Sequence, residues 1–209
     1  MTNEIDPNSS ETERERYSVI IMDPPTMTAQ QGARGASRQY DLMTWEELEG
    51  LAPAVQALGA DNSWLVLWST NAALPQSLQL MTKLGYRYIT NMVWDKRPHM
   101  GLGNYLRNSH ELVLWGLRGR SPFAFRGQRS VIDFPRGLHS EKPLEFAALL
   151  DRVLPSGARL EMFARARPTS RLNYAIWGNQ VDSDVSLAEW GYYVPSDFAR
   201  QGTDGERKV

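Results

Sequence analysis

The sequence contains no cysteine, only three histidines and no long hydrophobic run. Without cysteine, the chain can form no disulfide, no thiolate metal site and no cysteine nucleophile. The histidines, His99, His110 and His139, do not have the spacing of metal ligands, so we expect no metal site. No stretch resembles a signal peptide or approaches the length of a membrane span. We therefore expect a soluble, cytoplasmic protein that does not bind membranes.

The sequence also has little net charge, −1 over 209 residues, which by itself does not indicate a nucleic-acid partner. The charge is unevenly distributed, because residues 1–65 hold 11 acidic and 4 basic residues whereas residues 96–136 hold 8 basic and 2 acidic ones. The basic residues of the second region are Lys96, Arg97, Arg107, Arg118, Arg120, Arg126, Arg129 and Arg136. They predict either a basic face that contacts the phosphates of nucleic acid or a set of solvated loop arginines.

What the sequence does contain is an alternation of apolar strands and helices. Apolar residues make up 42% of the chain, which is enough for the core of one domain. The pattern predicts strands over 17–22, 63–69, 86–95, 111–117, 130–134, 158–164 and 174–177, and helices over 44–58, 71–84 and 143–154. Such alternation predicts an α/β fold with a mostly parallel sheet and helices on both faces.

The helix boundaries carry local signals. Thr44 and Glu47 match a Thr-x-x-Glu capping box. Asn71 is placed to cap the second helix and Gly85 to end it. Pro143 suits the first turn of the third helix, because its missing N–H is not needed there.

The polar ends of the sequence predict the domain boundaries. Residues 1–16 are polar and acidic and are expected to form a disordered lead. Residues 17–182 form the domain, and residues 183–209 are expected to trail across its surface as a C-terminal extension. Residues 23–40 form a long loop rich in small polar residues, and loops of this length often serve as functional lids.

The tripeptide Asp23-Pro24-Pro25 directly follows the first apolar strand. Ligands of open α/β sheets bind at the carboxyl edge of the strands, so we expect the carboxylate of Asp23 to lie there. The prolines have no N–H, and the loop therefore presents carbonyl groups rather than donors. A carboxylate beside a carbonyl suits an amino group, but Asp-Pro-Pro also occurs in ordinary turns.

Other polar residues have two interpretations each. Glu161 lies in an otherwise apolar strand, where it either has a ligand or reaches water from a sheet edge. Lys142 opposes the helix dipole at a helix start, so it either binds a carboxylate or phosphate or is solvated. Gly178-Asn179-Gln180 ends the last strand and either offers amides to a ligand or forms a turn. No Gly-x-Gly-x-x-Gly follows the first strand, so the dinucleotide-binding fingerprint is missing.

Taken in order, the motifs of the sequence resemble those of one family. They are Asp23-Pro24-Pro25, Tyr40 with Met43, the run 65–71, Val93-Trp94-Asp95-Lys96, Asn108-Ser109-His110-Glu111, His139-Ser140-Glu141-Lys142-Pro143, Glu161-Met162-Phe163-Ala164-Arg165 and Trp177-Gly178-Asn179-Gln180. This order, over residues 17–182, resembles the N6-adenine methyltransferase family that contains the catalytic subunit of the eukaryotic mRNA adenosine methyltransferase. The resemblance implies a Rossmann-like, S-adenosylmethionine-dependent fold in circularly permuted order. The catalytic loop then precedes the cofactor motifs, which accounts for the missing glycine fingerprint.

The resemblance also implies roles for individual residues. The implied catalytic residues are Asp23, Pro24 and Pro25, of which Asp23 and the carbonyl of Pro24 would hold the target amine while a methyl group passes from S-adenosylmethionine to the N6 atom of adenine. The implied cofactor-binding residues are Asp23, Lys142, Glu161, Met162, Phe163, Arg165, Asn179 and Gln180. The implied substrate-binding residues are Thr26, Tyr40, Lys96, Arg107 and Asn108.

One position departs from the family pattern. Thr26 stands where the family usually has an aromatic residue, typically tryptophan, that stacks on the flipped base. Base–aromatic stacking is worth roughly 1–3 kcal/mol per base, so its loss weakens substrate binding unless another aromatic residue, Tyr40 or Trp45, replaces it.

Three functional interpretations follow from these residues. The first is an adenine-N6 methyltransferase that acts on nucleic acid, with DNA expected rather than RNA because the minimal chain resembles bacterial or phage members. Its target contacts come from the basic loops, or from a homodimer or a heterodimer with a related subunit. The second is an inactive relative that binds nucleic acid or a partner, which Thr26 favours. The third, a methyltransferase of small-molecule amines, leaves the basic region unexplained.

Overall fold

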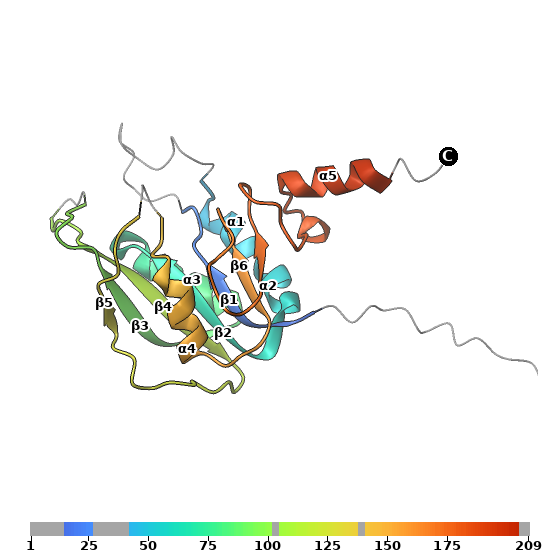
Figure 1. Cartoon of the computed structure of the whole chain (residues 1–209). Coiled ribbons are helices and arrows are strands. Elements are labelled where there is room, and N and C mark those ends of the chain that lie inside the picture. The colour runs from blue at the N-terminus through green and yellow to red at the C-terminus, as the bar shows by residue number, and fades with distance from the viewer. Residues whose placement is uncertain (1–14, 27–41, 102–104, 138–140, 205–209) are drawn as a thin grey trace, which may run out of the picture.

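The structure, a computed structural model, describes residues 15–26, 42–101, 105–137 and 141–204, with side chains described as far as residue 200. Its centre is a seven-stranded sheet in the order β5-β3-β4-β2-β1-β6-β7 (Figure 1). The strands are β1 (Tyr17–Met22), β2 (Gly59–Ser69), β3 (Arg87–Asp95), β4 (His110–Arg118), β5 (Val131–Ile132), β6 (Arg159–Met162) and β7 (Tyr174–Trp177). The seven predicted strands are therefore confirmed, β1 and β7 with the predicted bounds.

The sheet is mixed but mostly parallel, as predicted. β1 pairs in parallel with β2 on one side and β6 on the other, β6 with β7, and β3 with β5. Only β4 runs antiparallel to its neighbours, β2 and β3. The chain leaves β1 on one side and returns through β6 on the other, so the strand order reverses at β1. Ligands of open α/β sheets bind outside the carboxyl ends of the strands at such a switch point, and Asp23 directly follows β1 there.

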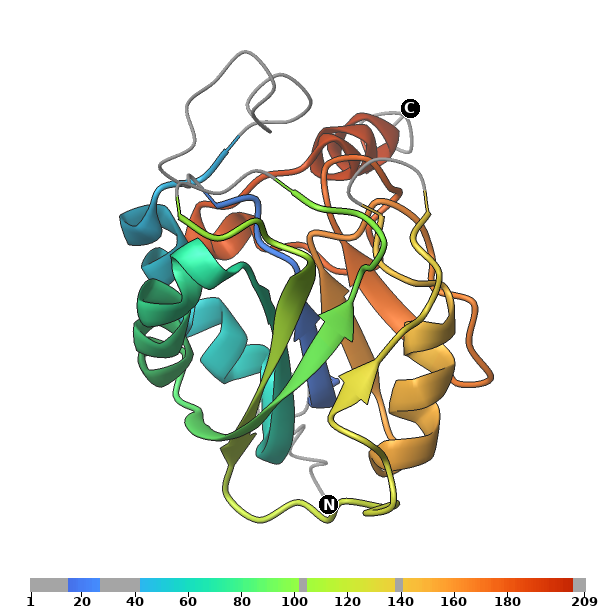
Figure 2. The same cartoon turned by 90° about the vertical axis from the view of Figure 1, so that its left-hand side faces the viewer.

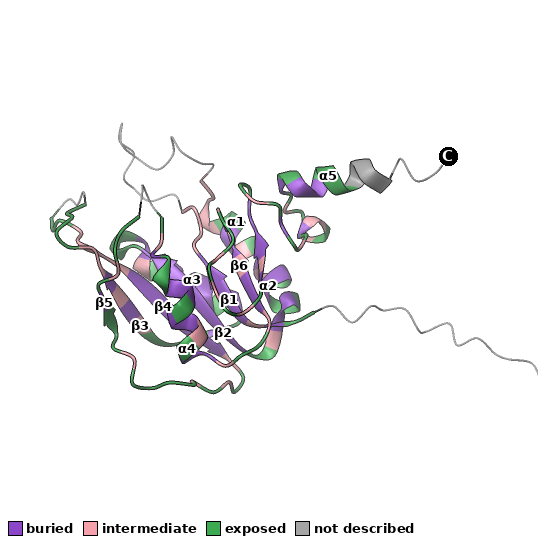
Figure 3. Ribbon diagram, in the orientation of Figure 1, coloured by how far each residue is buried: buried purple, intermediate pink, exposed green. Residues whose placement is uncertain are grey.

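Helices cover both faces of the sheet because successive residues of a buried strand point to opposite sides. The helices on these faces are α1 (Trp45–Gly50), α2 (Ala52–Leu58), α3 (Leu74–Lys83) and α4 (Glu145–Val153). Ile20 and Met22 of β1 face a core that contains α1, α2 and α3, whereas Val19 and Ile21 face the core closed by α4. Figure 2 shows these helices on the two sides of the sheet, and Figure 3 shows the sheet as the most buried layer. The α/β, Rossmann-like fold predicted from the sequence is confirmed.

The capping box and the helix-ending glycine are present as predicted. The N–H of Glu47 donates to Oγ1 of Thr44, and the N–H of Thr44 donates to the carboxylate of Glu47. The helix that begins there is shorter than predicted, because Leu51 separates α1 from α2 and Pro53 cannot donate to the preceding turn. Gly85 follows α3 with φ +88°, a conformation that glycine adopts without steric cost.

Two helix starts differ from the prediction. Asn71 does not cap α3; it opens a 3₁₀ turn, η2 (Asn71–Ala73), and its side chain donates to Oδ1 of Asn108 at 3.1 Å. α3 begins only after this turn, with a proline in its first turn. α4 begins at Glu145, two residues after Pro143.

The prediction that the C-terminal extension trails across the surface is wrong. After β7 the chain forms a 3₁₀ turn, η3 (Ala188–Trp190), and the helix α5 (Pro195–Asp204). Leu187 and Val194 are buried in the core that also contains α1 to α3. Two buried apolar side chains dock a segment whose overall polarity predicts exposure.

The other predicted end lies mostly beyond the described ranges. Of the expected lead 1–16, only residues 15 and 16 are described. Within the described parts of the chain, no helix is both long enough and apolar enough to cross a membrane.

The basic region 96–136 does not form one face. β4 runs through its middle and is antiparallel to β2 and β3, so the stretch between β4 and β5 lies at the opposite edge of the sheet from the residues before β4 and after β5 (Figure 2). The group at the carboxyl edge of β1 and β2 consists of Lys96, Arg97, Arg107 and Arg136, and the group beyond the other edge consists of Arg118, Arg120, Arg126 and Arg129. Only the first group lies on the side of the sheet edge where Asp23 is found.

Replacing Thr44 by alanine tests the capping box. The change removes the Oγ1 acceptor of the Glu47 N–H, and we expect the free energy of unfolding to fall by about 1 kcal/mol. Urea denaturation followed by circular dichroism measures this loss. Thr70→Ala is the matched control, because Thr70 precedes η2 without a side-chain cap and should matter less. Equal losses in the two variants would contradict the stabilising role of the box.

Candidate active site

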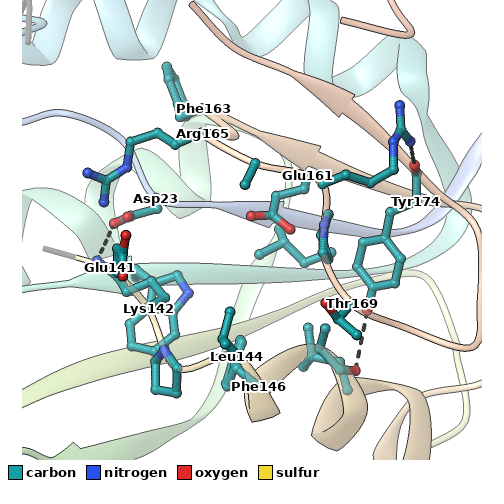
Figure 4. Close-up of a pocket in the computed structure, with 18 of the residues that line it drawn as sticks. Asp23, Glu141, Lys142, Leu144, Phe146, Glu161, Phe163, Arg165, Thr169 and Tyr174 are labelled. Atoms are coloured by element: carbon teal, nitrogen blue, oxygen red, sulfur yellow. Dashed lines mark hydrogen bonds and ion pairs between the residues drawn. The ribbon is translucent and has the colours of Figure 1, made fainter. Parts of the chain in front are cut away.

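Two adjoining pockets lie at the carboxyl ends of β1, β6 and β7. The first, here called the charged pocket, has a volume of about 380 Å³ and is lined by Asp23, Lys142, Glu161 and Arg165 among others. Figure 4 shows the carboxylates of Asp23 and Glu161 extending into the same space, with Lys142 next to Asp23. Among the described residues, no group of three or more histidine or acidic side chains could hold a metal ion.

The second pocket, here called the aromatic pocket, has a volume of about 260 Å³. Its aromatic walls are Phe163, Trp177, Tyr192 and Tyr193. Asp23 and Phe163 belong to the linings of both pockets. These two residues therefore form the boundary between a charged and a largely apolar compartment.

Lys142 is the centre of a chain of charges beside the charged pocket. Its Nζ lies 2.8 Å from Oδ1 of Asp23 and 3.3 Å from Oε2 of Glu111, and Nζ of Lys96 lies 2.7 Å from Oε1 of Glu111. Burial alone would lower the pKa of Lys142, but the two carboxylates outweigh it and raise that pKa. Burial would also raise the pKa of Glu111, but Lys142 and Lys96 lower it. Lys142 and Glu111 therefore stay ionised near neutral pH.

The interpretation of Lys142 as a solvated side chain is wrong, because its side chain is only 23% exposed and paired with two carboxylates. Its Nζ also lies 4.9 Å from the centre of the Trp68 ring. An ammonium group has three donors, and Asp23 and Glu111 engage two of them. One donor remains for a ligand, so the prediction that Lys142 binds the carboxylate of a cofactor stays a prediction.

Glu161 lies inside the sheet and not at its edge, because β6 has β1 on one side and β7 on the other. Its carboxyl lines the charged pocket. Burial, and to a smaller extent the charge of Asp23, raise the pKa of Glu161 to about 7. A carboxyl group with a raised pKa inside a pocket is a candidate to bind a ligand by hydrogen bonds.

Backbone hydrogen bonds fix the loop after β1. The N–H of Thr26 donates to the carbonyl of Pro24 at 2.9 Å, and the N–H of Met43 donates to the carbonyl of Pro25 at 2.8 Å. Thr26 and Met43 also form a parallel bridge. A carbonyl oxygen has two lone pairs, so the Pro24 carbonyl keeps one acceptor position. That Asp23 and Pro24 together hold an amino group stays a prediction.

The chain at the ends of β6 and β7 is strained and closely packed. Phe163 has φ +64°, a left-handed conformation that costs a bulky residue on the order of 1–3 kcal/mol and is typical of ligand clamps. A Cβ on Gly178 would lie 2.1 Å from the carbonyl oxygen of Ala164, so only glycine fits there. The next two residues face different pockets, Asn179 the aromatic one and Gln180 the charged one.

The predicted cofactor contact of Met162 stays a prediction, and the structure does not support one made by its side chain. Its side chain is fully buried in the core with α1 to α3 and lines neither pocket. Strand residues alternate between the two faces, so Met162 points away from the side that Glu161 takes. Trp45, one of the two aromatic residues expected to compensate for Thr26, packs against the same core and also lines neither pocket.

Three predicted substrate-binding residues lie at the same edge of the sheet but line neither pocket. Lys96 belongs to the chain of charges, and Nε of Arg107 donates to the carbonyl of Gly101 at 2.7 Å. The side-chain oxygen of Asn108 accepts from an asparagine amide. Tyr40 lies outside the described residues. The contacts of all four with a substrate stay predictions.

Sequence reasoning missed Glu111, Tyr192 and Tyr193 as site residues. Glu111 is a charged residue in an otherwise apolar strand, and this is the same signal that singled out Glu161. Tyr192 and Tyr193 form an aromatic pair directly after Gly191, in a segment that is otherwise polar. Neither signal indicates a partner, because the contacting residues are far away in the sequence.

Replacing Glu161 by glutamine tests its raised pKa. The unfolded chain releases this proton near pH 4.5, whereas the folded protein keeps it until about pH 7. The ionisation of Glu161 therefore does not affect the free energy of unfolding below pH 4.5. It lowers this free energy progressively as the pH rises from 4.5 to 7. Since one pKa unit corresponds to about 1.4 kcal/mol, we expect Glu161→Gln to be more stable than the wild type at pH 8 by about 1–3 kcal/mol.

Urea denaturation at pH 5 and pH 8 measures this difference. Asp133→Asn, an exposed loop carboxylate, is the control and should change the stability little at either pH. A gain for Glu161→Gln that is no larger at pH 8 than at pH 5 would show that the carboxyl is not perturbed in the fold.

The sequence of this chain is similar to a protein family and to several known proteins over the residues that form the site. The MT-A70 family model matches residues 17–180. The type II methyltransferase M.MunI of a Mycoplasma species is 28% identical over 92% of this chain and 84% of its own length. The N(6)-adenosine-methyltransferase catalytic subunit METTL3 of Homo sapiens is 24% identical over 80% of this chain and 28% of its own length.

The putative N(6)-adenosine-methyltransferase MT-A70-like of Medicago truncatula is 27% identical over 84% of this chain and 28% of its own length. The chain thus spans most of M.MunI but less than a third of the N(6)-adenosine-methyltransferases. The family match extends from β1 to the end of β7 and includes the residues of the charged pocket. The chain belongs to the MT-A70 family.

Proposed function

We propose that this chain is a DNA methyltransferase that transfers a methyl group from S-adenosylmethionine to the exocyclic N6 amine of adenine. Membership of the MT-A70 family supports the reaction, because methyltransferases of this family act on that amine and use S-adenosylmethionine as methyl donor. DNA as the substrate is supported by the match to the type II methyltransferase M.MunI, which is 28% identical over 92% of this chain, whereas METTL3 is 24% identical over 80% of it.

The charged pocket has the groups that the amino-acid end of this cofactor requires. A zwitterion needs a cation for its carboxylate and acceptors for its ammonium group, and Lys142, Asp23 and Glu161 supply both. Asn179 and Gln180 offer amides to the hydroxyl groups of a ribose. When bound, the sulfonium supplies an electrophilic methyl group, so the chain needs no nucleophile of its own.

The position of Asp23 carries the proposal. Its carboxylate lies between the two pockets, at the carboxyl end of β1, where the strand order reverses. Lys142 binds Oδ1, and Oδ2 can accept a hydrogen bond from an amine. The lone pair of an adenine amino group is delocalised into the ring, so hydrogen bonds to Asp23 and the Pro24 carbonyl activate it by orienting the nitrogen. Its proton becomes acidic only after methylation, and Asp23 therefore positions the amine first.

Contacts with the rest of the nucleic acid come from the basic group at the same edge of the sheet. Lys96 and Arg107 lie there, and Arg107 is exposed. If the target adenine lies in a duplex, it has to be extruded, which costs a few kcal/mol. A second subunit, either a copy of this chain or a related protein, is a further source of such contacts.

An inactive relative that only binds nucleic acid or a partner is the alternative. Thr26 favours it, because threonine has no ring to stack on a base. The charged pocket favours the enzyme, because a simple binding module has no need to keep Asp23 and Glu161 close together beside Lys142. Calorimetry with S-adenosylmethionine separates the two, since an inactive relative is expected to bind it poorly.

Labelled S-adenosylmethionine and adenine-containing DNA test the proposed reaction. We expect N6-methyladenine in DNA and less labelling of RNA with the same sequence. Asp23→Ala should lower the rate at saturating cofactor about 10²-fold or more, a loss typical of an oriented electrostatic group. Asp61→Asn is the control, because Asp61 lies near the start of β2, at the other edge of the sheet, and should leave the rate unchanged.

Methyl transfer that survives Asp23→Ala would contradict the role of Asp23. Transfer to RNA but not to DNA would contradict the substrate. Cofactor binding too weak to measure, together with no transfer, would favour the inactive relative. Preferred methylation of a small amine would favour the third interpretation.

A further inference from the structure

We infer that the segment 191–198 completes the cofactor site, with Tyr193 stacking on the adenine ring of S-adenosylmethionine in the aromatic pocket. The inference rests on the proposed function, because it takes the cofactor from there. It concerns residues beyond the stretch 17–180 that the family model matches. The C-terminal segment would then be a part of the binding site and not an appendage.

The composition of the aromatic pocket suits a flat, neutral heterocycle. Phe163, Trp177, Tyr192 and Tyr193 surround about 260 Å³, and Asn179 adds one amide. The indole Nε1 of Trp177 is buried and has no hydrogen-bond acceptor among the described residues. An adenine ring offers nitrogen acceptors, an exocyclic donor and two faces for stacking.

The division between the two pockets matches the two ends of the cofactor. Lys142 and Glu161 line only the charged pocket, and Tyr192 and Tyr193 line only the aromatic one. S-adenosylmethionine has a zwitterionic amino-acid arm and an uncharged adenosine arm, joined at the sulfonium. With one arm in each pocket, the join falls at their shared wall, where Asp23 lies. The same residue is the one proposed to hold the target amine.

Tyr193 is held in place before any ligand binds. Gly191 has φ +84°, which lets the chain turn sharply, and the hydroxyl of Tyr192 donates to the carbonyl of Glu47. The ring of Phe198 stacks on that of Tyr193, with centroids 6.0 Å apart and planes 26° apart. Tyr193 is nevertheless 54% exposed, so its ring retains surface that a ligand can cover. A supported and exposed aromatic ring beside a pocket is a suitable stacking surface.

The target adenine is the other possible occupant of the aromatic pocket. The cofactor adenine is favoured because Asn179, in the turn after β7, faces this pocket while its neighbour Gln180 faces the charged one. A ligand bound along the ends of β6 and β7 meets both amides in succession. The basic group expected to contact nucleic acid, including Lys96 and Arg107, lines neither pocket.

Isothermal titration calorimetry with S-adenosylmethionine and 5′-methylthioadenosine tests the inference, because the second compound lacks the amino-acid arm. Tyr193→Ala should weaken the binding of both compounds by about 10-fold, the loss expected for one stacked base. Tyr193→Phe keeps the ring and should bind both nearly as well as the wild type. Lys142→Met should weaken S-adenosylmethionine but not 5′-methylthioadenosine.

Tyr88→Ala is the matched control, because Tyr88 is also about half exposed but lies near the start of β3, at the other edge of the sheet. Thermal unfolding of each variant confirms that it is folded. Unchanged affinity of Tyr193→Ala for both compounds overturns the inference. If Tyr193→Ala instead raises the KM for the DNA substrate and leaves the affinity for both compounds unchanged, the target base occupies the aromatic pocket.

The outcomes also separate this inference from the proposed function. Weaker cofactor binding by Tyr193→Ala, in a protein that methylates no nucleic acid, supports the inference and contradicts the proposed function. Methylation of DNA with an unchanged cofactor affinity in Tyr193→Ala supports the proposed function and overturns the inference. A wild-type protein that binds neither compound overturns both.

Discussion

The arrangement of the site depends on one ammonium group between two carboxylates. Lys142 bridges Asp23 and Glu111, which come from the end of β1 and the start of β4. Without the cation, the two carboxylates would lie close together in a partly dehydrated pocket and repel each other. The desolvation of buried ions offsets much of their attraction, so the bridge contributes more to geometry than to stability. It holds three segments of the chain around the charged pocket.

The bridge is possible because β4 is antiparallel to its neighbours. Glu111 lies at the start of β4. Because β4 runs in the reverse direction, its start lies at the edge of the sheet where β1 and β2 end. In a parallel β4 the same glutamate would lie at the far edge, beyond the reach of Lys142. The same reversal sends the arginines after β4 away from the site. One strand direction thus determines both the pairing at the site and the division of the basic residues.

The boundary between the two pockets combines strain with close packing. Phe163 is held in a left-handed conformation, and its ring meets that of Trp177 edge to face at 5.3 Å. Gly178 allows the backbone after β7 to approach Ala164 more closely than any other residue would. The segment after β7 then adds its tyrosines from the other side. The site therefore has aromatic surface although Thr26 has no ring, and it lies in the aromatic pocket, which Pro25 and Met43 also line.

Local patterns along the chain were sufficient to predict the strands and the capping box of Thr44, because these depend on residues close together in the sequence. The alternation of strands with helices was sufficient for the mostly parallel sheet, because parallel neighbours need a crossover connection. The order of short motifs was sufficient for the family. The sequence could not show that Glu111 pairs with Lys142, that Met162 turns away from the site, or that residues 183–200 dock against the domain and bring Tyr193 to a pocket. These features depend on which distant segments meet across the sheet, and only the folded chain, through strand direction and the alternation of faces, decides that.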